Sequence, residues 1–334
     1  MFRSELLTAH EPDSLAPALR ASEVPSPVRG ERVRGGRSIL EVSGKVRCNL
    51  PQFCYLIRVP DPSLLLLIPA YNEESRIEPV LRDYARYFQE HYHGNFRLIV
   101  VLNGCRDNTL EVVKKVSNDF KSIQYLNFPA PIGKGGALIE GLKLCNQGDL
   151  IGYVDADGAT APAAFLKLVG HIGGADCVIG SRWMQQSILH QKQTRLRRFI
   201  SRGFHTIVEA LFWMHIHDTQ CPAKLMRSTA IQRVLPTLLI ADLAFDVNLL
   251  VSLNRAGFKI LEVPIEWTDM VGSKVTSSLF RSSMSMFLSV VRVRLIYWPT
   301  VYKLLRPLRP LEGWIYSKLR QPHPLSSSEP PTAK

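Results

Sequence analysis

Residues 63–74 read SLLLLIPAYNEE, an apolar run that ends at Pro69 and passes directly into polar residues. An uninterrupted aliphatic run is typical of a strand that is buried on both faces, as in the middle of a parallel sheet. A helix is expected to begin near Glu73. This stretch therefore predicts the first strand and the first helix of an α/β domain.

The same alternation of strand and helix continues along the chain. Strand-like and helix-like segments follow in turn: RLIVVLNG (97–104), DNTLEVVKKVSNDF (107–120), SIQYLNF (122–128), KGGALIEGLKLC (134–145), LIGYVDADG (150–158), a helix after Pro162, and DCVIGSR (176–182). Such alternation indicates a mostly parallel sheet with right-handed crossovers. Because these sheets bind ligands at the carboxyl ends of their strands, the site residues are expected where strands stop.

The remaining segments complete this domain. A basic helical stretch extends from 182 to about 214. It is followed by the loop HIHDTQCPAK (215–224), the helix AFDVNLLVSLNRAG (244–257) and the strand KILEVPIEW (259–267).

A basic amphipathic helix is expected near the C-terminus, because residues 279–305 alternate apolar residues with Arg and Lys. Its apolar side either completes the core or lies in a membrane interface. The predicted organisation is a disordered leader at 1–62, the α/β domain at 63–275, basic amphipathic membrane-interface helices at 276–320, and a disordered tail at 321–334.

Composition limits the possible partners and compartment. The chain has 334 residues, is 46% hydrophobic and carries a formal net charge of +12, so it can bury a core and needs an anionic partner. Nucleic acid, acidic lipid and phosphorylated substrates all fit that charge. Its six cysteines include no C-x-x-C pair, which indicates neither a zinc site nor a disulfide framework and favours a reducing cytoplasm. Neither a secretory signal nor a transmembrane helix is predicted.

Two carboxylates close the strand at 150–158. Asp155 and Asp157 are separated by one residue and precede Gly158, so both emerge at a strand end. Carboxylates at this spacing can share a hard cation that also holds phosphate oxygens, which makes them candidate ligands of Mg²⁺ or Mn²⁺. A strand-end turn with solvated aspartates is the alternative interpretation.

A glycine-rich turn opens the helix at 134–145. Residues 133–136 read GKGG, so backbone N–H groups and Lys134 could point at a phosphate. The turn lacks the spacing G-x-x-x-x-G-K-[ST], which argues against an NTPase, and an ordinary helix-opening turn is the alternative. Together with the carboxylate pair one strand later, it predicts a diphosphate held between a metal and a lysine.

Several short motifs occur in the following order: IPAYNEE (68–74), a G-x-x-D-x-T turn (104–109), GKGGAL (133–138), DADGAT (155–160), GSR (180–182), DTQC (218–221), AFDVNLL (244–250), EVPIEW (262–267) and GSKV (272–275). This order resembles that of family 2 glycosyltransferases with the GT-A fold, and within them the dolichyl-phosphate glucosyltransferases and related polyprenyl-phosphate sugar transferases. The resemblance extends from about 64 to 299. It implies a GT-A, Rossmann-like α/β fold, a mostly parallel sheet flanked by helices, with a C-terminal amphipathic helix.

The resemblance also implies roles for individual residues. The expected nucleotide-sugar contacts are Pro69, Ala70, Tyr71, Glu73, Asn103, Lys134 and Asp155. The expected metal ligands are Asp155 and Asp157, which form the catalytic group together with Asp218 and Gln220. The expected acceptor-phosphate contacts are Arg182, Arg197, Ser201 and Lys224, of which the first three match the spacing of lipid-phosphate contacts in polyprenyl-phosphate mannosyltransferases.

The chain departs from the family pattern in three places. Where the family has Asp-Asp-Gly-Ser, residues 102–105 read LNGC, so Asn103 offers an amide in place of a carboxylate. Pro222 replaces a glycine in the DTQC segment and stiffens that loop. Eukaryotic glucosyltransferases of this kind also have an N-terminal membrane anchor, which is not expected here.

A phosphate acceptor fits the charge of this chain. A phosphomonoester is already an anionic nucleophile near neutral pH, whereas a sugar hydroxyl needs a general base. Residues 182–202 contain six Lys or Arg and no Asp or Glu, which suits an anionic acceptor, although a solvated basic helix face is the alternative.

The predicted function is inverting transfer of a hexose, glucose from UDP-glucose, to a polyprenyl or dolichyl phosphate by a cytoplasmic enzyme peripherally associated with a membrane. GDP-mannose as donor and a saccharide hydroxyl as acceptor remain alternatives, the latter with Asp218, Asp246 or Glu266 as base. A non-catalytic relative is disfavoured by the retained Asp155 and Asp157. A nucleic-acid-binding protein is disfavoured because no stacking aromatics are interleaved with the basic residues.

Overall fold

The computed structural model describes residues 61–189, 195–268 and 279–297, and within them it does not place the side chains of 195–201, 279–285 and 296. These residues belong to one compact unit, Val59–Lys334. The predicted leader and tail lie outside the described residues, apart from 61–62.

The strand predicted from SLLLLIPAYNEE is β1 (Leu64–Ala70), which lies inside a seven-stranded sheet of order β3-β2-β1-β4-β7-β5-β8. It pairs in parallel with β2 (Phe96–Asn103) on one side and β4 (Leu150–Tyr153) on the other. Alternate residues of β1 enter two different cores, Leu66 on one face and Leu67 on the other. The uniformly apolar sequence therefore reflects burial on both faces of the sheet.

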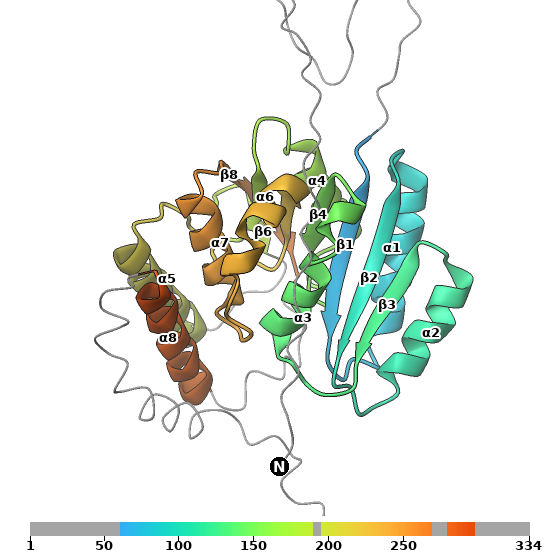
Figure 1. Ribbon diagram of the computed structural model, residues 1–334, viewed down its shortest axis with the longest axis horizontal. Helices are drawn as coiled ribbons and strands as arrows, with labels where there is room; N and C mark the ends of the chain where they lie inside the picture. The colour runs from blue at the N-terminus through green and yellow to red at the C-terminus, as the bar shows by residue number, and fades with distance from the viewer. Residues whose placement is uncertain (1–60, 190–194, 269–278, 298–334) are drawn as a thin grey trace, which may run out of the picture. The chain divides into compact units, whose positions relative to one another are not determined.

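Helices cover both faces of this sheet (Figure 1). One layer consists of α1 (Ile77–His91), α2 (Thr109–Asp119) and α4 (Pro162–Gly170). The other consists of α3 (Lys134–Leu142), α6 (Ser228–Val234) and α7 (Phe245–Arg255). The predicted α/β architecture is confirmed.

The remaining strands of the large sheet are β3 (Ile123–Phe128), β5 (Cys177–Ser181), β7 (Lys224–Arg227) and β8 (Ile260–Pro264). β7 is antiparallel to both of its neighbours, β4 and β5, and it was not predicted. Its sequence KLMR is too short for a pattern of period 2 to be recognised. As a consequence Lys224, expected at the end of a loop, instead enters the sheet beside Tyr153.

Two further boundaries differ from the predictions. α1 begins at Ile77 rather than near Glu73, because residues 73–76 form a turn in which the N–H of Arg76 bonds to the carbonyl of Glu73. The predicted strand at 259–267 is split into β8 and β9 (Glu266–Trp267), and β9 pairs with β6 (Ile188–Leu189) in a separate small sheet.

Two long helices complete the unit. α5 (Arg195–Phe212) packs against α8 (Leu279–Ile296), which also contacts α7 (Figure 1). Both helices were predicted, but the predicted helical start at 182 is wrong, because residues 188–189 form β6 and α5 begins at Arg195. The predicted extension of the second helix to 305 lies outside the described residues. In the part of the chain that the structure describes, no helix has both the length and the apolar character needed to cross a membrane.

Candidate active site

The site is built around the ion pair between Lys134 and Asp155. Asp155 follows the end of β4, and Lys134 is the first residue of α3. The Nζ of Lys134 lies 2.5 Å from Oδ1 of Asp155. Burial would lower the pKa of Lys134, but the charges of Asp155 and Asp246 outweigh this effect and raise it. Lys134 is therefore held as a cation beside the acidic pair.

Asp157 completes the acidic pair in a less favourable environment. Its Oδ1 accepts a hydrogen bond of 3.0 Å from the N–H of Ala159. Burial first, and then the charge of Asp155, raise the pKa of Asp157, while Lys134 and Arg76 act in the opposite direction. Because its negative charge is disfavoured by both effects, a bound cation would stabilise it, and the pair fits a divalent metal.

The glycines of the GKGG turn have a packing role as well. Gly133 adopts a left-handed conformation with φ of 82°, and a Cβ on it would lie 2.3 Å from the carbonyl oxygen of Ala241. A Cβ on Gly135 would lie 2.6 Å from the carbonyl oxygen of Ile240. The N–H of Gly136 donates to the carbonyl of Ala241 at 3.0 Å. The N–H of Gly136 is therefore already paired, so it is not among the N–H groups of this turn that could point at a phosphate.

The predicted nucleotide contacts at the end of β1 are Pro69, Ala70, Tyr71 and Glu73. The loop that holds them is joined to the start of α2, because Oδ1 of Asn72 accepts from the N–H of Arg106 at 2.8 Å and the N–H of Glu73 donates to Oγ1 of Thr109 at 2.8 Å. The carboxylate of Glu73 is bound by Arg76, with Nη2 at 2.6 Å. Arg76 was missed by sequence analysis, and its only local signal is the i,i+3 spacing from Glu73.

Asn103, which stands where the family has a carboxylate, is buried. Its Oδ1 accepts a hydrogen bond of 2.7 Å from the N–H of Ile132. The side chain thus ties the end of β2 to the turn that precedes α3. An amide performs this task without placing a negative charge inside the protein.

Arg182 and Asp218 form a closed pair at the end of β5. Nε and Nη2 of Arg182 donate to Oδ2 and Oδ1 of Asp218 at 2.7 and 2.8 Å, and its backbone N–H donates at 3.0 Å. The guanidinium lies over the ring of Trp267, 5.1 Å from its centroid. Burial would raise the pKa of Asp218, but the charge and hydrogen bonds of Arg182 lower it overall. Each group neutralises the other.

Lys224 and Asp246 form a second closed pair, which is more deeply buried. The Nζ of Lys224 lies 2.5 Å from Oδ1 of Asp246, which also accepts a hydrogen bond of 2.6 Å from the hydroxyl of Tyr153. Lys224 is fully buried and also donates to the carbonyl of Cys221. These contacts do not support the predicted contact between Lys224 and an acceptor phosphate, because its ammonium group is already satisfied inside the protein.

The other predicted residues are placed as follows. The Nε2 of Gln220 is buried and, among the described residues, has no hydrogen-bond partner. An unsatisfied buried donor is costly, so it indicates a group that meets a ligand or water. Arg197 and Ser201 both fall in α5, and their side chains lie outside the described residues.

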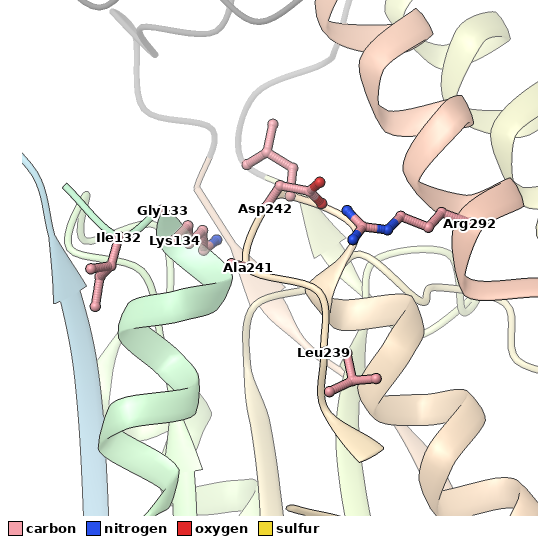
Figure 2. Close-up of a pocket in the computed structure, with 8 residues that line it drawn as sticks. Ile132, Gly133, Lys134, Leu239, Ala241, Asp242 and Arg292 are labelled. Atoms are coloured by element: carbon pink, nitrogen blue, oxygen red, sulfur yellow. The ribbon is translucent and has the colours of Figure 1, made fainter. Parts of the chain in front are cut away.

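Next to Lys134 the structure has a pocket of about 480 Å³, which sequence analysis missed (Figure 2). Its walls come from the start of α3, the loop at 239–243 and α8. The lining residues are Ile132, Gly133, Lys134, Leu239, Ala241, Asp242, Leu243 and Arg292. The glycines of GKGG were the available signal, because glycine often marks a close approach between two backbone segments.

The mostly parallel sheet and the acidic pair beside a lysine at its carboxyl edge define the class of protein, a GT-A transferase. The model of glycosyl transferase family 2 matches residues 66–235, and the chain belongs to this family. The resemblance inferred from the motifs is therefore confirmed.

Similar proteins support this assignment. A dolichyl-phosphate beta-glucosyltransferase of Dictyostelium discoideum is 33% identical over 253 residues, covering 72% of this chain and 76% of that protein. The protein of the same name from Saccharomyces cerevisiae is 30% identical over 258 residues, with the same coverage of 72% and 76%. Glucosyl-3-phosphoglycerate synthase of Mycobacterium tuberculosis, solved with Mn²⁺, UDP and glucosyl-3-phosphoglycerate, has a TM-score of 0.54 at 18% identity over 70% of this chain and 80% of that chain. This last likeness shows the fold.

Proposed function

We propose that this glycosyltransferase moves glucose from UDP-glucose to a dolichyl or other polyprenyl phosphate at a membrane surface, with inversion at the anomeric carbon. The observation that carries the proposal is the similarity to dolichyl-phosphate beta-glucosyltransferases over 72% of this chain. The acidic pair beside Lys134 at the strand ends supports it, because this arrangement suits a donor diphosphate.

Asp155 and Asp157 would hold Mg²⁺ or Mn²⁺. When bound, the cation screens the charge that develops on the diphosphate leaving group. No group of three or more His, Cys, Asp and Glu residues suited to a metal occurs among the described residues. The diphosphate and water would supply further ligands.

Lys134 would bind the same diphosphate. Its ammonium group is paired with Asp155, and a phosphate oxygen can take over as partner. Lys134 also lines the pocket. The buried donor of Gln220 would contact the sugar or the acceptor, in agreement with its lack of a partner among the described residues.

The reaction is a single displacement. An oxygen of the acceptor phosphate forms a bond to the anomeric carbon, the bond from that carbon to the UDP oxygen breaks, and its electron pair stays on the diphosphate. No proton has to be removed from a phosphate dianion. Two of the carboxylates considered as bases for a hydroxyl acceptor, Asp218 and Asp246, are ion-paired and buried, which favours the phosphate acceptor.

Acceptor binding and membrane attachment would involve the two basic helices. Arg182, Arg197 and Ser201 remain proposed contacts of the acceptor phosphate, and for Arg182 the contact requires exchange with Asp218. Peripheral attachment is supported by the basic residues of α5 and α8 and by Trp213, which follows α5 and is 83% exposed. Tryptophan is favoured at the membrane–water interface.

A transfer assay tests the proposal. Purified protein is incubated with a short polyprenyl phosphate and either radiolabelled UDP-glucose or GDP-mannose, with and without EDTA. We expect labelled lipid from UDP-glucose only, loss of product in EDTA, and a β-linked sugar phosphate by NMR. Transfer from GDP-mannose alone, or an α-linked product, would overturn the proposed donor or the single displacement.

A further inference from the structure

The pocket between α3 and α8 combines charged and apolar groups in one space. Figure 2 shows the guanidinium of Arg292 pointing from α8 toward the carboxylate of Asp242, with Lys134 on the wall formed by α3. Leu239 and Leu243 belong to the same lining and are 59% and 39% exposed. A volume of about 480 Å³ lies within the usual range for small-molecule sites.

The wall at 239–243 is held in place by side chains behind it. Oδ1 of the fully buried Asn248 accepts from the N–H groups of Leu239 and Ile240 at 2.9 and 3.2 Å. The same wall is fastened to α3 by the bond from Gly136 to Ala241. The pocket is therefore preformed, and a ligand does not have to order the loop.

Asp242 links this wall to α8. Its Oδ1 accepts from the N–H of Ala244 at 2.8 Å, and its Oδ2 accepts from the hydroxyl of Ser289 at 2.7 Å. Arg292 lies one helical turn beyond Ser289, on the same face of α8. The carboxylate of Asp242 is thus a fixed negative charge on the pocket wall, and the guanidinium of Arg292 points toward it (Figure 2).

Other cations near the site are less accessible to an acceptor. Lys224 is fully buried and paired with Asp246. Both Nε and Nη2 of Arg182 donate to the carboxylate of Asp218. Arg292 is an exposed side chain on the pocket wall. A planar guanidinium matches a phosphate in bidentate geometry, and exposed leucines beside it suit a hydrocarbon chain.

We propose that this pocket binds the acceptor, with Arg292 holding the phosphate and with Leu239 and Leu243 contacting the first isoprene units. The inference rests on the proposed function and adds the position of its acceptor. The ligand class is an amphiphilic phosphomonoester. The acceptor phosphate then lies in the pocket that Lys134 also lines. Because Lys134 would bind the donor diphosphate, the two substrates are brought close together.

Steady-state kinetics with a water-soluble prenyl phosphate, in buffer without detergent or vesicles, test the role of Arg292 independently of membrane attachment. Arg292→Ala should raise KM for the prenyl phosphate about tenfold to hundredfold, the effect of one charge-assisted contact, with kcat and the KM for UDP-glucose nearly unchanged. Arg292→Lys should recover part of the loss. Arg233→Ala, the same change at an exposed arginine of α6, serves as the matched control.

Two further variants separate the phosphate from the lipid. Leu239→Ser should weaken binding of the prenyl phosphate but leave inhibition by inorganic phosphate unchanged, whereas Arg292→Ala should weaken both. Asp242→Asn should lower the KM for the prenyl phosphate severalfold, because it removes a negative charge from the pocket lining that repels the phosphate. A purely structural role of Asp242 predicts a lower melting temperature and loss of all activity instead.

The outcomes distinguish this inference from the proposed function. If the wild-type protein transfers no glucose to any prenyl phosphate, the proposed function fails. If wild-type transfer is normal but Arg292→Ala leaves the acceptor KM unchanged, or lowers only kcat, the acceptor does not bind at Arg292. If Leu239→Ser has no effect while Arg292→Ala does, the pocket binds phosphate without recognising the lipid.

Discussion

Two lysine–aspartate pairs in this molecule have the same length and opposite environments. In each, the lysine Nζ lies 2.5 Å from a carboxylate oxygen. The side chains of Lys224 and Asp246 are 0% and 7% exposed, whereas those of Lys134 and Asp155 are 29% and 28% exposed. Distance alone therefore does not tell which pair serves the structure and which serves a ligand.

Burial explains the difference. Breaking a buried pair leaves a charge without water or partner, so Lys224 and Asp246 are committed to each other and to the interior. A partly exposed pair such as Lys134 and Asp155 is partly screened by water, and either partner can be exchanged for a ligand at little cost. Lys134 and Asp155 also lie at the carboxyl edge of the sheet, where a donor diphosphate is expected. The predictions below test this division.

The largest effect is expected from the acidic pair. Asp155→Asn or Asp157→Asn should abolish transfer, because an unscreened diphosphate leaving group loses several kcal/mol of stabilisation. Asp157→Asn should affect folding little, since it relieves the repulsion between two like charges, whereas Asp155→Asn also removes the partly exposed ion pair with Lys134. Radiolabel transfer and thermal unfolding measure the two effects, with Asp119→Asn as control at an exposed carboxylate. Full activity of either variant, or of the wild type in EDTA, would contradict the metal assignment.

The buried pair should show the reverse behaviour. Lys224→Met should lower the free energy of unfolding by about 3–5 kcal/mol, because Asp246 then stays buried without a cation. Denaturant unfolding followed by circular dichroism measures this loss. Lys143→Met is the matched control, since Lys143 forms an exposed i,i+3 pair with Glu140 and should change stability little. If Lys224→Met and Lys143→Met were equally stable, burial would not determine the cost of breaking an ion pair in this protein.

A smaller effect is expected at the basic helix α5. Arg197→Ala should remove a contact to the acceptor worth about 1.5–3 kcal/mol, roughly a tenfold to hundredfold increase in the acceptor KM. The KM for the donor should stay nearly unchanged, and lysine should recover only part of the loss. An unchanged acceptor KM, or damage to donor binding, would make this segment an ordinary solvated face. Comparison with Arg292→Ala shows which helix contributes more to acceptor binding.

The smallest effects per residue concern membrane attachment. Sedimentation with vesicles should show binding that strengthens with anionic lipid and weakens with salt, with about 1 kcal/mol for each basic residue near the surface. Neutral vesicles of the same size are the control. Protein retained in carbonate-washed membranes would indicate insertion in place of peripheral attachment.

Local patterns predicted most elements of the fold and missed those that depend on distant partners. β7 was missed because a four-residue strand has too few positions to show a period, and it forms only by insertion between β4 and β5. The split between β8 and β9 was missed for a similar reason. At Ile265 the chain leaves the large sheet, where its N–H bonds to Ser181 and its carbonyl to Ile188.

The sequence by itself determined the α/β fold, the family, and the position of Asp155, Asp157 and Lys134 at one edge of the sheet. These follow from apolar periodicity and from strands that end in parallel, both of which are local or topological properties. Only the tertiary structure decided which charges are available to a ligand. Lys224 and Lys134 are alike in the sequence, but the first is enclosed by Asp246 and Tyr153, whereas the second opens into the pocket at 239–243 and α8. Availability depends on burial and on partners far away in the chain, and neither is encoded in the residues around a single position.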